Sequence, residues 1–199
     1  MSVNIYDDCS FTSIKDFSDN TALNSFNCGN SDLNEFFTED AIKYSSSLMG
    51  KTYAFFLDSD KESIVCMFTV SNDSLKADDL PNSRKKKLNK VIPRIKQRKS
   101  YPAVLIGRLG VSIKYSGSGV GTQLMDFIKA WFIDPLNKTG CRFIVVDAYN
   151  TENAIKYYEK NEFSFLFSSE EQEKKYLNIE PQDKLNTRMM YFDLLSLEA

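Results

Sequence analysis

Three closely spaced glycines join a strand-like segment to a helix-like segment in the middle of the chain. The segment from Ala103 to Val111 is apolar and β-rich, and an apolar stripe at helical spacing begins at Val120. Gly117, Gly119 and Gly121 lie around this junction. Glycine tolerates a positive φ and lets backbone approach a ligand closely, and the N–H groups at a helix start attract anions. The spacing therefore predicts a phosphate-holding strand–turn–helix unit; a turn that only lets strand and helix pack is the alternative.

The spacing of these glycines distinguishes this turn from two common nucleotide-binding turns. A P-loop requires G-x-x-x-x-G-K-[ST], which is absent, so ATP hydrolysis is disfavoured. A dinucleotide-binding turn requires G-x-G-x-x-G, whereas this chain has G-x-G-x-G. The ligand of the turn, if there is one, is therefore a phosphate held in another way.

Hydrophobic periodicity and turn residues predict the remaining elements. Asn30 to Asp32 can cap a first helix, and Asp58 to Asp60 can form the turn of an antiparallel hairpin. The expected elements are a helix over 30–44, strands over 52–57 and 63–70, a helix from 120 that ends before Pro135, a buried strand over 143–146, a helix capped by Thr151, and strands over 163–167 and 189–194. This order predicts an α+β fold on a mixed sheet.

The chain has no histidine among its 199 residues. Catalysis by Ser-His-Asp or Cys-His groups, histidine general bases and histidine-ligated metal sites are therefore excluded. Proton transfer has to use Asp, Glu, Tyr, Lys, Cys or water.

Length and cysteine content predict one domain over residues 1–199 in a reducing compartment. A chain of 199 residues can bury a sizeable core without disulfides. Its four cysteines are far apart, which favours free thiols over a local metal or redox pair. We also expect neither a signal peptide nor a membrane span, and hence a cytoplasmic protein.

Charge is distributed unevenly along the chain, although the formal net charge is only −2. Residues 84–99 contain nine basic residues and no acid. This basic segment could meet phosphates, or it could be a solvated connecting segment, helical from Arg84 to Asn89 and broken near Pro93. The charged stretch from Glu170 to Lys175 is predicted to be an exposed loop.

Two motifs resemble those of the GNAT superfamily of N-acetyltransferases. Arg108 to Thr122 resembles the acetyl-CoA-binding motif Q/R-x-x-G-x-G/A, with Lys114 at the Arg or Gln position and with Gly117 and Gly119 matching. Asn153 to Phe163 is similar to the family's N-x-x-A-x-x-x-Y-x-x-x-G-F helix. In that helix Ala154, Tyr158 and Phe163 match, whereas Thr151 replaces the Asn and Glu162 replaces the Gly.

The N-terminal part resembles one bacterial subgroup of this family. Phe26 to Asn30, followed by Leu33 to Phe37 and Ala41, is similar to a subgroup that includes the toxins that acetylate aminoacyl-tRNA, together with uncharacterised relatives. Arg188 to Phe192 resembles the last strand of the same subgroup. These matches equally fit shared helix packing that says nothing of the substrate.

The resemblance implies a GNAT-like mixed, mostly antiparallel sheet flanked by helices, and an enzyme that transfers acetyl from acetyl-CoA directly to an amine. The implied oxyanion donor is the N–H of Val111, and the implied general acid is Tyr158. The implied cofactor-binding residues are Leu109, Gly110, Val111, Lys114, Tyr115, Ser116, Gly117, Ser118, Gly119, Val120, Gly121, Thr122 and Asn153. No metal is expected.

The resemblance leaves the base, the acceptor and the oligomeric state open. The base is a carboxylate, with Asp147 as a candidate, or a water chain; a cap or turn role for Asp147 is equally consistent. Tyr157 is the weaker candidate acid, and Cys141 is interpreted as a buried small hydrophobe. The acceptor is a small amine, a protein amine or aminoacyl-tRNA, and homodimers are common in the family. A non-catalytic acyl-CoA-binding or protein-interaction module on the same fold is the alternative function.

Overall fold

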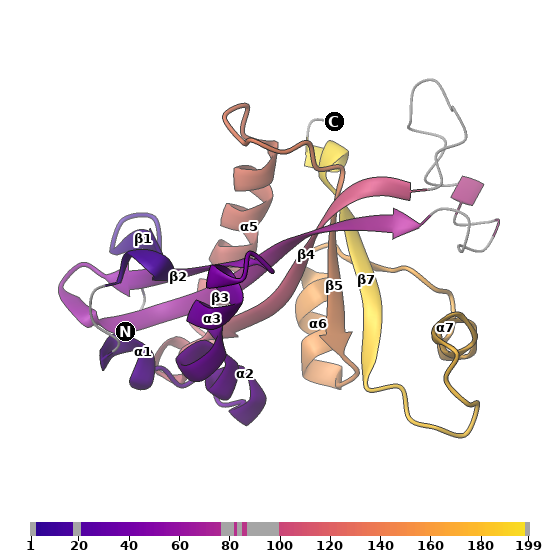
Figure 1. The fold of residues 1–199 in the computed structure, drawn as a ribbon, viewed down its shortest axis with the longest axis horizontal. Helices are drawn as coiled ribbons and strands as arrows, with labels where there is room; N and C mark the ends of the chain where they lie inside the picture. The colour runs from indigo at the N-terminus through magenta and orange to yellow at the C-terminus, as the bar shows by residue number, and fades with distance from the viewer. Residues whose placement is uncertain (1–2, 18–20, 77–81, 83–84, 87–99, 198–199) are drawn as a thin grey trace. The chain divides into compact units, whose positions relative to one another are not determined.

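A computed structural model describes residues 3–17, 21–76, 82, 85–86 and 100–197 (Figure 1). Its strands form a seven-stranded sheet in the order β1-β2-β3-β4-β5-β7-β6. The strands are β1 (Cys9–Ser13), β2 (Lys51–Leu57), β3 (Asp60–Lys76), β4 (Ser100–Val111), β5 (Phe143–Tyr149), β6 (Ser164–Phe165) and β7 (Thr187–Asp193). The helices are α1 (Thr21–Asn24), α2 (Ser31–Glu35), α3 (Ala41–Ser46), α5 (Val120–Ile133), α6 (Glu152–Lys160) and α7 (Glu170–Leu177), with short helical turns η1 (Ile14–Asp16), η2 (Phe36–Asp40), η3 (Ile113–Tyr115) and η4 (Leu194–Leu197).

This architecture confirms the predicted α+β fold with a mostly antiparallel sheet. β2 pairs antiparallel with β1 and β3, and β7 pairs antiparallel with β5 and β6. The chain divides into two compact units, Met1–Ser71 with Ile106–Trp131 and Asn72–Leu105 with Phe132–Ala199. A single acetyltransferase domain over 1–199 stays a prediction. Within the described ranges, every helix is too short or too polar to span a membrane.

The first unit buries both faces of its strands. Because side chains alternate along a strand, Phe55 and Phe56 of β2 point to opposite faces. Phe56 belongs to a buried cluster with Phe37 of η2 and Ala41 of α3. Phe55 instead packs edge-to-face on Phe127 of α5, with ring centres 4.9 Å apart. The N-terminal helices and α5 therefore cover opposite faces of these strands, as Figure 1 shows for α3 and α5.

The second unit is built on the pairing of β5 with β7. Phe143 of β5 and Tyr191 of β7 are buried in one apolar cluster, with ring centres 5.9 Å apart. Leu166 and Phe167 extend this cluster from the segment after β6. The predicted strand over 163–167 is real but short, because only Ser164 and Phe165 pair with β7.

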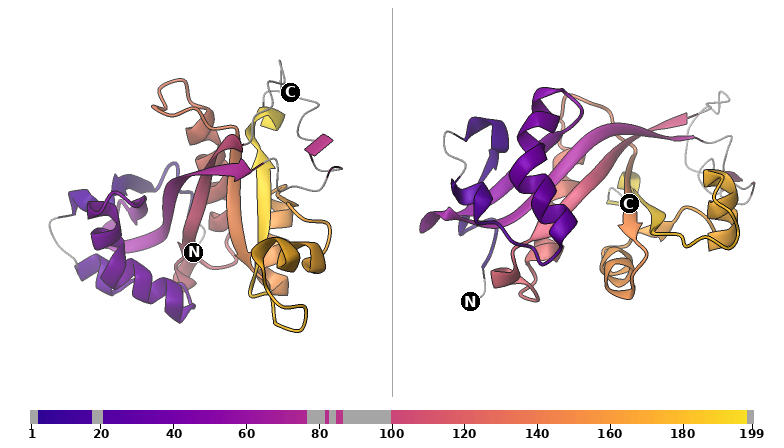
Figure 2. Two further views of the ribbon diagram at one scale, coloured as in Figure 1. Left: turned by 45° about the vertical axis from the view of Figure 1, so that its right-hand side comes forward. Right: turned by 60° about the horizontal axis from the view of Figure 1, so that its bottom comes forward.

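The predicted exposed loop from Glu170 to Lys175 is wrong, because these residues form α7 (Figure 2). Ser169 caps the helix, with its Oγ accepting from the N–H of Gln172, and Asn178 ends it with a φ of +56°. Glu173 is fully buried and is paired with Arg188 of β7, Nε to Oε2 at 2.7 Å. The counter-charge that lets a glutamate be buried lies 15 residues away, so local charge pattern could not reveal it.

Two other expectations differ from the structure. β1 was not among the predicted elements, and its Phe11 stacks on Tyr53 of β2 with ring centres 5.1 Å apart. The first helix is confirmed, with Asn30 Oδ1 accepting from the N–H of Leu33 at 3.1 Å, but it contains the π-helical turn η2. The basic segment 84–99 lies outside the described residues apart from Lys85 and Lys86, which are helical, so neither its predicted break nor its solvation is described.

Glu162 supplies a test of backbone strain. It stands at the glycine position of the second GNAT-like motif and has a φ of +65°. A side chain in this left-handed region costs about 1 kcal/mol. We expect Glu162→Gly to have a higher free energy of unfolding than Glu162→Ala by about that amount, measured by urea denaturation. Both variants lose the same carboxylate, so equal stabilities would show that the backbone is not strained there.

Candidate functional site

The glycine-rich turn begins where the backbone of β4 leaves the sheet. The N–H of Ser112 donates to the carbonyl of Val65 at 2.9 Å, and the N–H of Ile113 donates to the carbonyl of Asn27 at 2.9 Å. The turn η3 follows, with the N–H of Tyr115 bonded to the carbonyl of Ser112 at 2.8 Å. These bonds fix the end of β4 and the start of the turn within the first unit.

Two of the three glycines have the backbone conformation that favours glycine. The φ angles are +76° at Gly117 and +92° at Gly119, and nothing lies within 4 Å of a Cβ built at either position. Their importance is therefore conformational, since a side chain would meet open space but strain the backbone. Among the described residues, the N–H groups of Gly117, Gly119 and Val120 have no hydrogen-bond partner. They lie at or just before the N-terminus of α5, where the helix dipole favours an anion.

The loop from Phe26 to Asn30 packs against the end of β4 and the start of this turn. Gly29 has a φ of +82°, and a Cβ there would lie 3.2 Å from Cγ2 of Ile113. Cys28 sits against Gly110 of β4, where a Cβ would lie 3.1 Å from the Cβ of Cys28. Asn34 of α2 fixes the loop, because its Oδ1 accepts from the N–H of Cys28 at 2.9 Å. The segment that resembles the toxin-containing subgroup is thus packed against the end of β4.

A second support of the turn was missed in the sequence. Gln123, in the first turn of α5, accepts a hydrogen bond from the N–H of Ile5 at 2.8 Å and donates from Nε2 to the carbonyl of Val3. Ile5 is 1% exposed, so the N-terminal segment is part of the core of this unit. Only the apolar alternation of Val3 and Ile5 could have indicated this packing.

Tyr158 lies on α6 in the second unit. Thr151 caps this helix, with its Oγ1 accepting from the N–H of Ala154 at 3.4 Å. The half-buried ring of Tyr158 packs on Phe163, with centres 5.4 Å apart. Burial and, secondarily, the negative charge of Asp147 raise the pKa of the Tyr158 phenol well above its ordinary value. Tyr158 is therefore a protonated hydrogen-bond donor at neutral pH.

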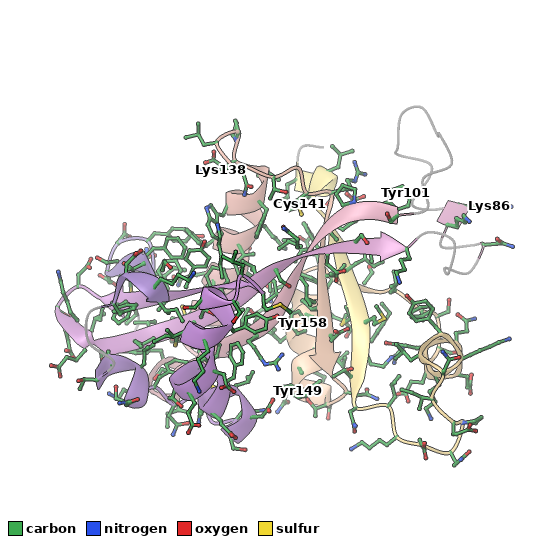
Figure 3. The ribbon with its side chains drawn as sticks, in the orientation of Figure 1. Lys86, Tyr101, Lys138, Cys141, Tyr149 and Tyr158 are labelled. Atoms are coloured by element: carbon green, nitrogen blue, oxygen red, sulfur yellow. The ribbon has the colours of Figure 1, made fainter. Side chains whose placement is uncertain are left out.

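The other predicted residues of the second unit differ in their environments. The pKa of Asp147 on β5 is raised above its ordinary value by partial desolvation and, secondarily, by the nearby charge of Asp73. The side chain of Asp147 is exposed. Asn153 is exposed in the first turn of α6. Cys141, labelled near the start of β5 in Figure 3, is half-buried, and burial raises the pKa of its thiol to about 11. Cys141 is thus a poor nucleophile, although it is less buried than predicted.

Each unit therefore brings together one part of the predicted site. Leu109 to Thr122 form a continuous segment from β4 through η3 to the start of α5 in the first unit. Lys114, Ser116, Gly117 and Gly119 are exposed, whereas Gly110, Tyr115 and Val120 are buried. Tyr158 and Asp147 interact electrostatically in the second unit. Over the ranges that the structure describes, no group of three Cys, Asp or Glu side chains could hold a metal ion.

Comparison with known proteins gives a family match and a fold match. Residues 88–164 match the acetyltransferase (GNAT) domain family. AtaT complexed with acetyl-methionyl-tRNAfMet is 20% identical, with a TM-score of 0.67 over 96% of this chain and 98% of that chain. A Tyr-to-Phe mutant of KacT is 19% identical, with a TM-score of 0.72 over the same shares. A Tyr-to-Phe mutant of the AtaT toxin, bound to the C-terminus of the antitoxin AtaR and acetyl-CoA, is 19% identical, with a TM-score of 0.62 over 96% and 97%. The family match confirms the resemblance to the GNAT superfamily over residues 88–164, and the solved structures show the same fold.

The positive φ of Gly119 leads to a binding prediction. We expect Gly119→Ala to raise the Kd for CoA by about 5- to 30-fold, because the substituted turn relaxes in the free chain and binding has to restore a φ that costs about 1–2 kcal/mol with a Cβ. Isothermal titration calorimetry measures the change. Gly140→Ala is the matched control, since a Cβ there also meets open space but the φ of Gly140 is not positive. Equal affinities of the two variants would contradict a role of the turn geometry in binding.

Proposed function

We propose that the chain acetylates the α-amino group of an aminoacyl-tRNA. The premise is that residues 88–164 match the acetyltransferase domain of the GNAT superfamily. The observation that most supports acetyl-CoA as donor is the turn with three unpartnered N–H groups, at Gly117, Gly119 and Val120. Diphosphate binds well to backbone N–H groups at a helix start. The AtaT structures that contain acetyl-methionyl-tRNAfMet or acetyl-CoA support the same donor and acceptor.

The backbone of the first unit would hold the donor. We assign Leu109 to Val111 to pair with the pantetheine arm in the manner of an added strand. The turn from Lys114 to Thr122 would bind the diphosphate, with Lys114 adding a positive charge where the family motif has Arg or Gln. Asn153 is assigned a contact with the cofactor from α6.

The reaction would be a direct transfer. The neutral acceptor amine attacks the thioester carbonyl, and the C–N bond forms while the C–O π electrons move to oxygen. The N–H of Val111 is assigned to this oxyanion. Collapse of the intermediate breaks the C–S bond, and the sulfur leaves with the electron pair and receives a proton. The excess proton of the nitrogen goes to a carboxylate, for which Asp147 is the candidate, or to water.

Tyr158 is proposed as the donor to the leaving sulfur. Its raised pKa means that the phenol resists full ionisation. Its contribution is then a hydrogen bond to the developing thiolate, with the proton delivered as charge moves onto sulfur.

Substitution of Tyr158 tests this role. We expect Tyr158→Phe to lower kcat by about 100-fold or more while the Kd for acetyl-CoA is unchanged. Because the pKa of Tyr158 is raised above its ordinary value of about 10, the rate of the native chain should show no decline from tyrosine ionisation up to about pH 10. Tyr157→Phe is the matched control on the same helix. An unchanged kcat in Tyr158→Phe, or an equal loss of kcat in Tyr157→Phe, would contradict the assignment.

The acceptor is tested with purified chain, acetyl-CoA and charged tRNA. We expect acetyl transfer to aminoacyl-tRNA and little transfer to free amino acids or polyamines, measured by thiol release and by mass spectrometry of the released amino acids. In bacterial cytoplasm, where aminoacyl-tRNA is abundant, induced expression should arrest growth, and Tyr158→Phe should relieve the arrest. Tight CoA binding without thiol release for any acceptor would favour the non-catalytic module instead.

A further inference from the structure

The guanidinium of Arg108 is partly buried, and one of its nitrogens has no hydrogen-bond partner among the described residues. It lies in β4, and its guanidinium carbon is 5.0 Å from the ring centre of Phe36 in η2. Its Nη1 donates to the carbonyl of Gly107, the preceding residue, at 2.8 Å. Its Nε is buried and has no hydrogen-bond partner among the residues described. Over the ranges that the structure describes, the Nε–Nη2 edge of the guanidinium therefore makes no hydrogen bond to the protein.

Two other arginines that lie over aromatic rings have the carboxylate partner that Arg108 lacks. Arg142 and Arg188 also lie over phenylalanine rings, at 5.5 and 4.4 Å. Arg142 donates from Nη2 to Oδ2 of Asp193 at 2.9 Å, and Arg188 donates from Nε to Oε2 of Glu173 at 2.7 Å. Arg108 has no such carboxylate within 4 Å in the described ranges. A half-buried guanidinium with an unpaired donor costs free energy that an anion would offset.

The position of Arg108 relates it to the proposed reaction. It directly precedes Leu109, the first of the strand residues assigned to the pantetheine arm. Gly110, two residues further on the same face of β4, packs closely against Phe37 of η2. Arg108 therefore faces the π-helical turn η2, and such turns are frequent at functional sites.

We propose that the Nε–Nη2 edge of Arg108 binds a phosphate of the acceptor, next to the nucleotide that carries the amino acid. This inference rests on the proposed function. A guanidinium edge matches two oxygens of a phosphate or a carboxylate. In aminoacyl-tRNA the carboxyl group of the amino acid is esterified, so the phosphodiester is the anion nearest to the reacting amine. A free carboxylate is the ligand that the test has to separate from it.

Kinetics with two acceptors test the inference. One acceptor is aminoacyl-tRNA, and the other is aminoacyl-adenosine, which lacks the phosphate. We expect Arg108→Gln to raise KM for aminoacyl-tRNA by about 10- to 100-fold, as for loss of hydrogen bonds to a charged group, with kcat nearly unchanged. KM for aminoacyl-adenosine should change less than about twofold. Arg108→Lys should be intermediate, because it keeps the charge and loses the two-donor edge. An equal loss on both acceptors overturns the proposal, as does a loss confined to acceptors with a free carboxylate.

A binding measurement separates this inference from the proposed function. With CoA at saturation to occupy the glycine turn, adenosine monophosphate should raise the melting temperature of the native chain and of Arg142→Gln but not that of Arg108→Gln. This result would stand even if no tRNA is acetylated. Binding of the monophosphate that is the same in Arg108→Gln and the native chain overturns the phosphate site.

Melting temperatures test the alternative that Arg108 only stabilises the fold. Arg108→Met keeps an apolar stem over Phe36 and removes the unpaired donor, so its melting temperature should equal or exceed that of the native chain. Under the same conditions Arg188→Met, which leaves Glu173 buried without its partner, should melt at a clearly lower temperature. A large destabilisation by Arg108→Met would show that this arginine serves the fold, and would overturn the inference.

Discussion

The first unit depends on where backbone hydrogen bonding stops at the end of β4. Ser112 and Ile113 are the last residues whose N–H groups are bonded to neighbouring segments, Val65 and Asn27. Beyond them the chain turns through positive φ at Gly117 and enters α5. The N–H groups of Gly117 and Gly119 are at exposed positions beside a helix N-terminus and have no partner among the described residues, which suits this turn to an anionic ligand.

The buried ion pair of the second unit joins residues that are distant in sequence. Glu173 is buried because Arg188 meets it from β7, and the same arginine lies 4.4 Å from the ring of Phe165. This arrangement attaches α7 to the sheet of the second unit. Arg108 has the ring but not the carboxylate, which is why the same side-chain type is structural in one place and a ligand candidate in the other. A net charge near zero therefore says little about where anions bind.

Sequence patterns predicted the elements whose cause is local. The apolar stripe from Val120 gave α5, the capping residue Thr151 gave the start of α6, and the GNAT-like motifs gave the fold. Patterns failed where the cause is a distant partner. α7 was interpreted as a loop because its charges look solvated, and the core position of Ile5 depends on Gln123, 118 residues away. The unpaired edge of Arg108 is likewise visible only in three dimensions, because a sequence does not show which arginines lack a carboxylate.

Because the chain has no histidine, its proton transfers depend on other side chains. A histidine changes charge near neutral pH, whereas Tyr158 has its pKa raised by burial and by Asp147 and stays protonated. Such a group is poorly suited to the proton abstraction that begins hydrolysis. It suits a reaction whose electrophile is already activated, since a thioester needs only hydrogen-bond donors for its oxyanion and its leaving sulfur. Burial and the charge of Asp147 make the phenol of Tyr158 harder to ionise. It can therefore donate a hydrogen bond and keep its proton until charge develops on the leaving sulfur, as acyl transfer requires.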